Sequence, residues 1–292
     1  MAERDQAAKE RDQWRQYQWA APGHFYSPVP SLEELKQQET AIWGPPPLDI
    51  PGVDLNEAGQ ARLFEALKTY YPEMPAYERH KQEGLRYFYK NGYFPLGDAI
   101  ILYGMIRHLR PRRIIEIGSG FSSAVTLDTN QLYFDNHIAC TFIEPHPGRL
   151  FNLMEEGDRA RCEVIQSNLQ EVPLSCFEQL AANDILFIDS THVAKTHSDV
   201  NYYLFHILPA LASGVYIHIH DVFYPFEYPK GWVYQGITWN EDYLLRAFLQ
   251  YNQRFQIQFF SSFLEQFHRV SFLRDMPLYL TDPGGSLWLK KV

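Results

Sequence analysis

The sequence has few cysteines, and none of them is spaced for a disulfide framework or a zinc site. Its 292 residues include three cysteines, Cys140, Cys162 and Cys176, and no C-x-x-C pair. An odd number of scattered thiols argues against a small disulfide-stabilised secreted fold and favours a reducing compartment. We therefore expect buried structural thiols in a cytoplasmic protein.

Long apolar runs are also missing. No stretch of about 18 apolar residues occurs anywhere in the chain. The opening stretch MAERDQAAKERDQWRQYQWA lacks the apolar core of a signal peptide. The sequence therefore predicts neither a membrane span nor a membrane partner. Residues 1–18 are rich in charge and in helix formers, so we expect an exposed helix or a frayed arm there.

The chain has no excess of basic residues. It contains 26 lysines and arginines against 35 acidic residues, which gives a formal net charge of −9. Because a nucleic-acid partner requires a basic face, this balance argues against one. It fits an enzyme that acts on a small molecule, without choosing the substrate.

The residue pattern changes about a third of the way along the chain. Residues 1–94 combine short helical stretches with proline-rich connections, and Ser31 is placed to cap a helix together with Glu34. We predict a helical arm and cap for this part, and a second domain over residues 95–292. Apolar strands alternate with helices in that domain: RRIIEIG, HIACTFIEP, RCEVIQSN, DILFIDS and GVYIHIHD, followed by FQIQFF and GSLWLKK as a hairpin-like pair. The alternation predicts an α/β fold with a parallel sheet covered on both faces.

The turn after the first of these strands has the composition of a cofactor loop. In EIGSGFSS the glycines allow a ligand to approach the backbone closely, and the serines can cap the following helix. Ser123 replaces the third glycine of the dinucleotide fingerprint, so a nicotinamide dinucleotide is the less favoured ligand. The loop residues predicted to contact the cofactor are Glu116, Gly118, Ser119, Gly120 and Ser122.

Two further polar residues follow the next two strands. Glu144 lies about 25 residues after the glycines, near the spacing at which an acid binds a ribose diol. Ribose binding is the favoured role, and helix capping is the alternative. Asn168 is placed either to contact an adenine edge or to form a turn.

The motifs EIGSGFSS, FIEP, NLQE and DILFIDSTH stand in an order and at separations that resemble the class I S-adenosylmethionine-dependent methyltransferases. The resemblance is closest to the small-molecule O-methyltransferase branch. It implies a Rossmann-like sheet of seven strands in the order 3-2-1-4-5-7-6, with the last strand antiparallel. It further implies that Gly118 and Gly120 approach the methionine part of the cofactor, and that Glu144 binds the ribose.

The same resemblance points to a metal site at the reaction end of the sheet. In that branch one acid after the fourth strand and two residues after the fifth, typically acid then acid or amide, hold the ion. Asp189 and Asp221 match this pattern and His220 departs from it. Histidine can bind a metal but shifts the preference from Mg²⁺ toward softer ions. A metal-free reaction with His220 or His192 as general base stays open.

Strand alternation separates the two histidines of HIHD. His218 lies deeper in the strand and is expected to be a hydrogen-bonded core residue. His220 and Asp221 are expected at the rim, within reach of substrate. Lys195 is left open between a substrate contact and a carboxylate partner.

The segment after the fifth strand is dense in aromatic side chains. An apolar substrate wall or lid is the favoured interpretation, and packing against the N-terminal helices is the alternative. Glu227 and Glu241 are expected to supply polar contacts only. The aromatic residues are Phe223, Tyr224, Phe226, Tyr228, Trp232, Tyr234 and Trp239.

The sequence thus predicts an enzyme that methylates a hydroxyl of a small metabolite, sugar or natural product. Its cofactors would be S-adenosylmethionine and a divalent metal such as Mg²⁺ or Mn²⁺. The alternatives are an N-methyltransferase without metal and a non-catalytic protein that keeps the cofactor fold. A homodimer formed through residues 1–40 is a further expectation, with a lid as the other role of this arm.

Overall fold

The structure, a computed structural model, describes residues 19–292. The helix or arm predicted for residues 1–18 lies outside the described residues. The chain divides into two compact units, one formed by Met1–Pro47 with Tyr228–Trp239 and the other by Leu48–Glu227 with Asn240–Val292. The boundary between residues 94 and 95 stays a prediction.

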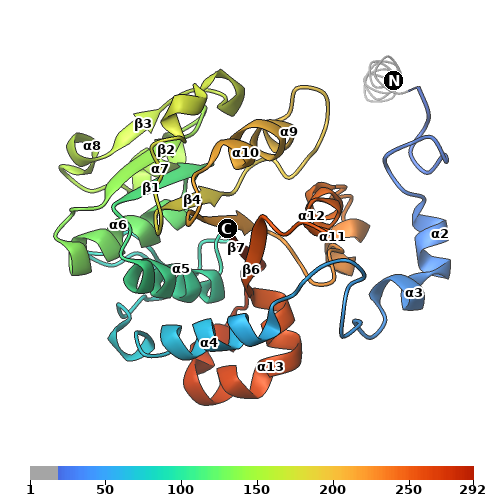
Figure 1. Cartoon of the computed structure of the whole chain (residues 1–292), viewed down its shortest axis with the longest axis horizontal. Helices are drawn as coiled ribbons and strands as arrows, with labels where there is room; N and C mark the ends of the chain where they lie inside the picture. Colours follow the sequence, from blue (N-terminus) through green and yellow to red (C-terminus); the bar gives the residue numbers. More distant parts are fainter. Residues whose placement is uncertain (1–18) are drawn as a thin grey trace, which may run out of the picture. The chain divides into compact units, whose positions relative to one another are not determined.

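Seven strands of the second unit form one sheet in the order β3-β2-β1-β4-β5-β7-β6, which confirms the predicted topology (Figure 1). Strands β1 to β5 run parallel, and β7 runs antiparallel to both β5 and β6. Every residue of β4 and β5 is buried, as expected for strands covered on both faces. The strands are Arg113–Ile117 (β1), Ala139–Ile143 (β2), Glu163–Ile165 (β3), Ile185–Ile188 (β4), Tyr216–His220 (β5), Phe255–Phe260 (β6) and Ser286–Lys291 (β7).

Helices cover the sheet, with α5 packed against α6 on one face and α9 and α10 on the other (Figure 1). The α-helices are Leu32–Gln37 (α2), Glu39–Trp43 (α3), Glu57–Leu67 (α4), Leu96–Leu109 (α5), Phe121–Phe134 (α6), Gly148–Leu153 (α7), Asp158–Arg161 (α8), Asp199–Tyr202 (α9), Leu208–Ala210 (α10), Lys230–Tyr234 (α11), Glu241–Leu249 (α12) and Ser261–Asp275 (α13). A π-helical turn, Tyr203–Ile207, joins α9 to α10, and short 3₁₀ helices occupy Tyr71–Glu73, Leu169–Glu171, Leu174–Cys176 and Pro277–Thr281. No helix within residues 19–292 combines the length and apolar composition needed to cross a membrane.

Two local predictions were wrong. The strands β6 and β7 do pair, but α13 and a 3₁₀ helix connect them, so they are not a hairpin. Helix α13 is kinked at His268, where the backbone leaves helical geometry. The short helix predicted in LSCFEQLA is only the 3₁₀ helix Leu174–Cys176.

The first unit is held together by contacts between α3 and the segment that contains α11. The indole Nε1 of Trp43 donates to the carbonyl of Tyr228 at 2.9 Å. The carboxylate of Glu39 accepts from Lys230 at 2.7 Å and from the hydroxyl of Tyr234 at 2.6 Å. This part of the aromatic run therefore packs against the N-terminal helices, which was the alternative to a substrate wall. Helix α2 in the same unit is capped by Ser31, as predicted.

Helix α4 protects the exposed edge of β6. The side-chain amide of Asn56 donates to the carbonyl of Ile257 at 2.7 Å, and Oε1 of Gln60 accepts from the N–H of Phe260 at 2.8 Å. An unpaired strand edge is a template for aggregation, and these two amides occupy two of its polar groups. Residues 48–94 therefore complete the sheet-bearing unit.

A buried ion cluster anchors the segment that leads into α5. Arg86 is 1% exposed and donates to Asp158 at 2.7 Å and to Asp128 at 2.9 Å. Asp128 also accepts the backbone N–H groups of Arg86 and Tyr87 at 2.9–3.0 Å. The cluster thus fixes the chain to α6 and α8 shortly before α5 begins.

Replacing Arg86 with methionine is expected to lower the free energy of unfolding by about 3–5 kcal/mol, because two buried carboxylates lose their cation. Urea denaturation at neutral pH measures this loss. The exposed Arg269, which pairs with the neighbouring Glu265, provides the control, and Arg269→Met should cost less than about 1 kcal/mol. A loss in Arg86→Met as small as that of the control would show that the cluster is not a structural anchor.

Candidate active site

A cavity of about 350 Å³ lies at the carboxyl ends of the first four strands of the sheet. This is the edge at which parallel α/β sheets bind ligands, and the volume suits a small molecule. The residues that line the cavity are Ile117, Gly118, Ile143, Glu144, Pro145, His146, Ser167, Asn168, Leu169, Gln170, Asp189, Ser190, Thr191, Lys195, His197, Ser198 and Asp199.

Glu144 is held in the cavity wall by backbone donors. One carboxylate oxygen accepts from the N–H of Ser119 at 3.3 Å and the other from the N–H of His146 at 2.8 Å. These two bonds fix the carboxylate and leave further lone pairs for a ligand hydroxyl. The arrangement suits the predicted ribose contact, which stays a prediction.

Gly118 brings the end of β1 against the end of β4. Its φ of 76° is favourable only for glycine, and a Cβ there would lie 1.7 Å from the carbonyl oxygen of Asp189. The N–H of Asp189 in turn donates to the carbonyl of Ile117 at 2.9 Å. The glycine is therefore required for Asp189 to reach the cavity.

Glu116 and Ser122 support the glycine turn and do not line the cavity. One oxygen of the buried Glu116 accepts from Ser122 at 2.5 Å and from Ser123 at 2.9 Å. Ser122 lies inside α6, whose N-cap residue is Gly120, so the prediction that Ser122 caps this helix was wrong. The predicted contacts of Glu116, Ser122 and Gly120 with the cofactor stay predictions.

Burial raises the pKa of Glu116 to about 8, even though the two serine hydroxyls lower it. A raised pKa means that the native state keeps a proton that the unfolded state loses above its ordinary value of 4.5. The free energy of unfolding should therefore fall as pH rises from about 5 to about 8. Glu116→Gln cannot titrate at this position, so its free energy of unfolding should fall less over the same pH range. The other titrating groups are the same in both proteins, so the difference between the two curves isolates Glu116. Urea denaturation across this range measures the difference, and equal pH dependence of the two proteins would contradict the buried, protonated state.

Asn168 lies at a turn, and its predicted contact with an adenine edge stays a prediction. It lines the cavity, and it precedes a 3₁₀ helix whose Glu171 accepts from its amide at 3.4 Å. Lys195 is exposed and lines the same cavity, so it is placed for a ligand contact.

Ser190 was missed by sequence reasoning, although it directly follows a predicted strand end. Its buried hydroxyl oxygen has no hydrogen-bond partner within residues 19–292, so it is available for a hydrogen bond to a ligand.

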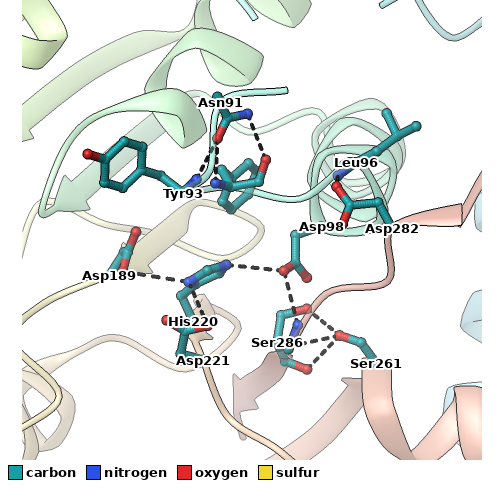
Figure 2. A network of polar contacts seen from close by, with 12 residues as sticks. Asn91, Tyr93, Leu96, Asp98, Asp189, His220, Asp221, Ser261, Asp282 and Ser286 are labelled. Carbon is teal, nitrogen blue, oxygen red and sulfur yellow. Dashed lines mark hydrogen bonds and ion pairs between the residues drawn. The ribbon is translucent and has the colours of Figure 1, made fainter. Parts of the chain in front are cut away.

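Beside the cavity, one ligand atom from each of Asp189, His220 and Asp221 lies within 4.8 Å of the other two (Figure 2). Nδ1 of His220 lies 3.6 Å from Asp189 and 3.5 Å from Asp221. His220 is only 2% exposed, so the prediction that it sits at the rim was wrong. The ring of Phe94 packs 5.1 Å from its ring and covers it.

His192 approaches the same two aspartates from the loop after β4. Its Nε2 lies 3.4 Å from Asp189 and 3.8 Å from Asp221. Its Nδ1 is hydrogen-bonded to Glu241 at 2.8 Å, and Glu241 also accepts from the hydroxyl of Tyr203 at 2.5 Å. Glu241 is fully buried, so it orients His192 and is more than the peripheral polar contact expected from the sequence.

Asp98 contacts the ring nitrogen of His220 that faces away from Asp189 and Asp221, and the sequence did not predict this contact. Its Oδ2 lies 3.1 Å from Nε2 of His220 and accepts the N–H of Gly285 at 3.1 Å (Figure 2). A Cβ on Gly284 would overlap this carboxylate, at 1.9 Å from Oδ2. The available signal was a lone acid near the start of α5, whose stretch LGDAIILYGMI is otherwise without charge.

The neighbouring carboxylates favour the protonated form of both histidines. Burial lowers the pKa of His192, but hydrogen bonds to Asp189 and Glu241 outweigh burial and raise this pKa to about 10. Burial likewise lowers the pKa of His220, and the charges of Asp221 and Asp189 raise it well above its usual value. Burial opposes ionisation of Asp189, yet His220 and His192 hold its pKa well below the usual range. These shifts disfavour the neutral imidazole that a general base requires.

His218 belongs to the core, but without the predicted hydrogen bond. Neither ring nitrogen has a hydrogen-bond partner in the described part of the chain, and burial lowers its pKa well below the usual value. The ring stacks on Phe187 at 3.9 Å and meets Trp288 edge-on at 4.8 Å. His218 therefore packs as an aromatic ring.

Comparison with known proteins gives a family. Residues 115–222 match the model of a methyltransferase domain. An uncharacterized protein of Archaeoglobus fulgidus is 36% identical over 172 residues, which cover 56% of this chain and 75% of the relative. Together with the strand order, these matches confirm the resemblance read from the motifs. The chain therefore carries the methyltransferase domain of this family, on a sheet with the class I strand order.

Solved structures are more distant. A methyltransferase of Podospora anserina bound to S-adenosylhomocysteine is 15% identical, with a TM-score of 0.44 over 90% of this chain and 98% of that one. The O-methyltransferase TomG of Streptomyces achromogenes, involved in tomaymycin synthesis, is 16% identical with a TM-score of 0.40 over 82% and 92%. Similarity at this level carries no information about the acceptor or the metal of this chain.

Proposed function

We propose that this methyltransferase transfers the methyl group of S-adenosylmethionine to a hydroxyl oxygen of a small molecule bound beside Asp189. The supporting observation is that Asp189 belongs both to the wall of the cofactor cavity and to the histidine–aspartate cluster. The cofactor supplies an electrophilic methyl group when it is bound. The protein's own contribution is to hold the acceptor oxygen in line with that group and to favour loss of its proton.

The residues proposed to hold the cofactor surround the cavity at the ends of β1 to β4. Glu144 would accept from the ribose hydroxyls, because its carboxylate is already fixed by two backbone donors. Gly118 and Ser119 would border the methionine part, and Asn168 the adenine. The unpartnered hydroxyl of Ser190 is a further polar contact for the ligand.

The cluster of Asp189, His220 and Asp221 is proposed to bind a divalent cation that holds the acceptor. Its donors fit a cation, because two carboxylates and an imidazole nitrogen converge within 4.8 Å. Such an ion lowers the pKa of a bound hydroxyl and so supplies the activation that oxygen acceptors need. Direct proton removal by His192 or His220 is the alternative, and it requires a neutral imidazole.

We further propose a cytoplasmic location for this enzyme and a hydroxylated natural product or metabolite as its acceptor. Cys140, Cys162 and Cys176 are all unpaired, in line with a cytoplasmic location. The acceptor would be a hydroxylated metabolite or sugar, within natural-product biosynthesis. A homodimer stays a prediction.

Calorimetry and product analysis test the proposal together. The protein should bind S-adenosylmethionine and S-adenosylhomocysteine, and the product should carry the new methyl group on oxygen by tandem mass spectrometry. Absence of cofactor binding would contradict the methyltransferase assignment. A methyl group on nitrogen, formed at full rate in chelator-treated protein, would instead support the metal-free alternative.

A further inference from the structure

An arginine without an acidic partner lies over the glycine turn that follows β1. Arg149, from α7, packs its side chain against Gly120, where a Cβ would lie 3.2 Å from Cδ and 3.8 Å from Nη1 of the arginine. Arg149 is exposed, and no carboxylate within residues 19–292 forms an ion pair with it. Its guanidinium, which carries five N–H donors, is therefore available to an anion.

A stack of aromatic rings holds the guanidinium in this position. Cζ of Arg149 lies 3.7 Å from the centroid of the Tyr93 ring, and that ring stacks on Phe121 at 6.0 Å with an interplanar angle of 10°. The loop that carries Tyr93 is fixed by Asn91, whose Oδ1 accepts the N–H groups of Tyr93 and Phe94 at 2.8 Å (Figure 2). Stacking on an aromatic face orients a guanidinium and leaves its N–H edge for hydrogen bonds.

The start of α6 supplies further donors at the same turn. This 14-residue helix begins at Phe121 and has Gly120 as its N-cap residue. The first N–H groups of a helix lack intrahelical partners, and the helix dipole favours an anion there. The residue before the N-cap, Ser119, is 9% exposed, and its hydroxyl has no hydrogen-bond partner in the described part of the chain. Because buried polar atoms are nearly always paired, this hydroxyl independently indicates a ligand.

Two glutamates stand near the turn, and neither of them pairs with Arg149. Burial raises the pKa of Glu116 to about 8, so this carboxyl group is mostly uncharged at neutral pH. The carboxylate of Glu144 accepts from the backbone N–H groups of Ser119 and His146. The positive charge of Arg149 is thus left for a ligand.

The strand order places this turn where the amino-acid part of the cofactor would lie. Strands β3, β2 and β1 are neighbours in that order, and Asn168, Glu144 and the glycine turn follow their carboxyl ends. With the adenine at Asn168 and the ribose at Glu144, the aliphatic chain that leaves the ribose extends toward the turn. That chain ends in an α-carboxylate, which is the one anionic group of the cofactor.

We infer that Arg149 is a cofactor-binding residue whose guanidinium, with the hydroxyl of Ser119 and the N-terminus of α6, binds the α-carboxylate of the methionine part. The inference rests on the proposed function, since it specifies which groups of the protein recognise this cofactor. Tyr93 is a positioning residue that acts through Arg149. Arginine can hold a carboxylate with two parallel N–H···O bonds, so Arg149→Lys should retain only part of the affinity.

Calorimetry with two ligands isolates the carboxylate. The full-length protein is titrated with S-adenosylhomocysteine and with its decarboxylated analogue, which keeps the adenosine, the thioether and the amine. In Arg149→Met the affinity for S-adenosylhomocysteine should fall by about 10- to 100-fold, whereas the affinity for the analogue should not fall. Arg159→Met is the matched control, because it removes another exposed guanidinium, stacked on Phe151 at 4.0 Å and outside the cavity lining. It should change neither affinity.

Two variants of Tyr93 test its positioning role. Tyr93→Ala should weaken binding of S-adenosylhomocysteine by about 3- to 10-fold without weakening binding of the analogue, and Tyr93→Phe, which keeps the ring, should restore the wild-type affinity. Unchanged binding of S-adenosylhomocysteine in Arg149→Met, or an equal loss for both ligands, would overturn the inference and leave the methyltransferase proposal intact. A wild-type protein that binds neither ligand would contradict the methyltransferase proposal itself.

Discussion

Replacing Asp221 with alanine is expected to slow methyl transfer by about 10²- to 10³-fold, comparable to the loss of one electrostatic contact to a transition state. Asp221 faces both His192 and His220, so its loss weakens the cation site and leaves the acceptor without activation. It does not line the cavity at the ends of β1 to β4. The affinity for S-adenosylhomocysteine should therefore stay within about threefold of the wild-type value, which corresponds to less than 1 kcal/mol.

Asp135→Ala is a matched control for this substitution. Asp221 has a φ of 54° and Asp135 a φ of 51°, so alanine meets a similar left-handed backbone strain at both positions. Asp135 is exposed and lies after α6, away from the cavity lining. Equal activities of the two variants in a radiolabelled methyl-transfer assay would show that Asp221 affects the backbone and not the chemistry.

Replacing Glu144 with alanine is expected to weaken binding of S-adenosylmethionine and S-adenosylhomocysteine by about 100-fold. Hydrogen bonds to a charged group contribute about 1.5–3 kcal/mol, and about 2.7 kcal/mol corresponds to 100-fold in affinity. The carboxylate would accept from the ribose in the bound state, and the N–H groups of Ser119 and His146 already orient it. Isothermal titration calorimetry measures both ligands directly.

Two variants make the Glu144 result interpretable. Glu144→Gln keeps an acceptor oxygen without the charge, so its affinity should lie between those of the wild type and of Glu144→Ala. Glu178→Ala removes an exposed carboxylate that does not line the cavity, and should leave binding unchanged. Wild-type affinity in Glu144→Ala would mean that the cavity binds another ligand or holds the cofactor in another orientation.

The sheet, and the polar residues at the carboxyl ends of its strands, could be predicted because the sequence patterns that indicate them are local. Near-continuous apolar strands end at Ile117, Ile143, Ile188 and Ile219 or one residue later, and polar residues follow each end directly. Parallel strands place these ends at one edge, so Glu144, Asp189 and Asp221 could be assigned to it. The strand order followed from the family resemblance, which the same motifs carry.

The carboxylates that contact the two histidines, Asp98 and Glu241, could not be predicted, because these contacts join residues distant in sequence. Asp98 meets His220 across 122 positions, and Glu241 meets His192 across 49. Alternation along β5 assigned His220 to one face of the strand but could not reveal that Phe94 covers it. Whether a histidine at a strand end is exposed or buried is decided by what packs on it, and here that is the segment before α5.

The central claim is that the cofactor cavity and the histidine–aspartate cluster form one site of methyl transfer to oxygen. It is tested most directly by incubating the cobalt-loaded or manganese-loaded protein with methyl-labelled S-adenosylmethionine and a fractionated pool of hydroxylated small molecules. We predict a labelled product with its methyl group on oxygen, formed by the wild type and by Asp135→Ala but not by Asp221→Ala. A product formed equally well by Asp221→Ala would contradict the claim.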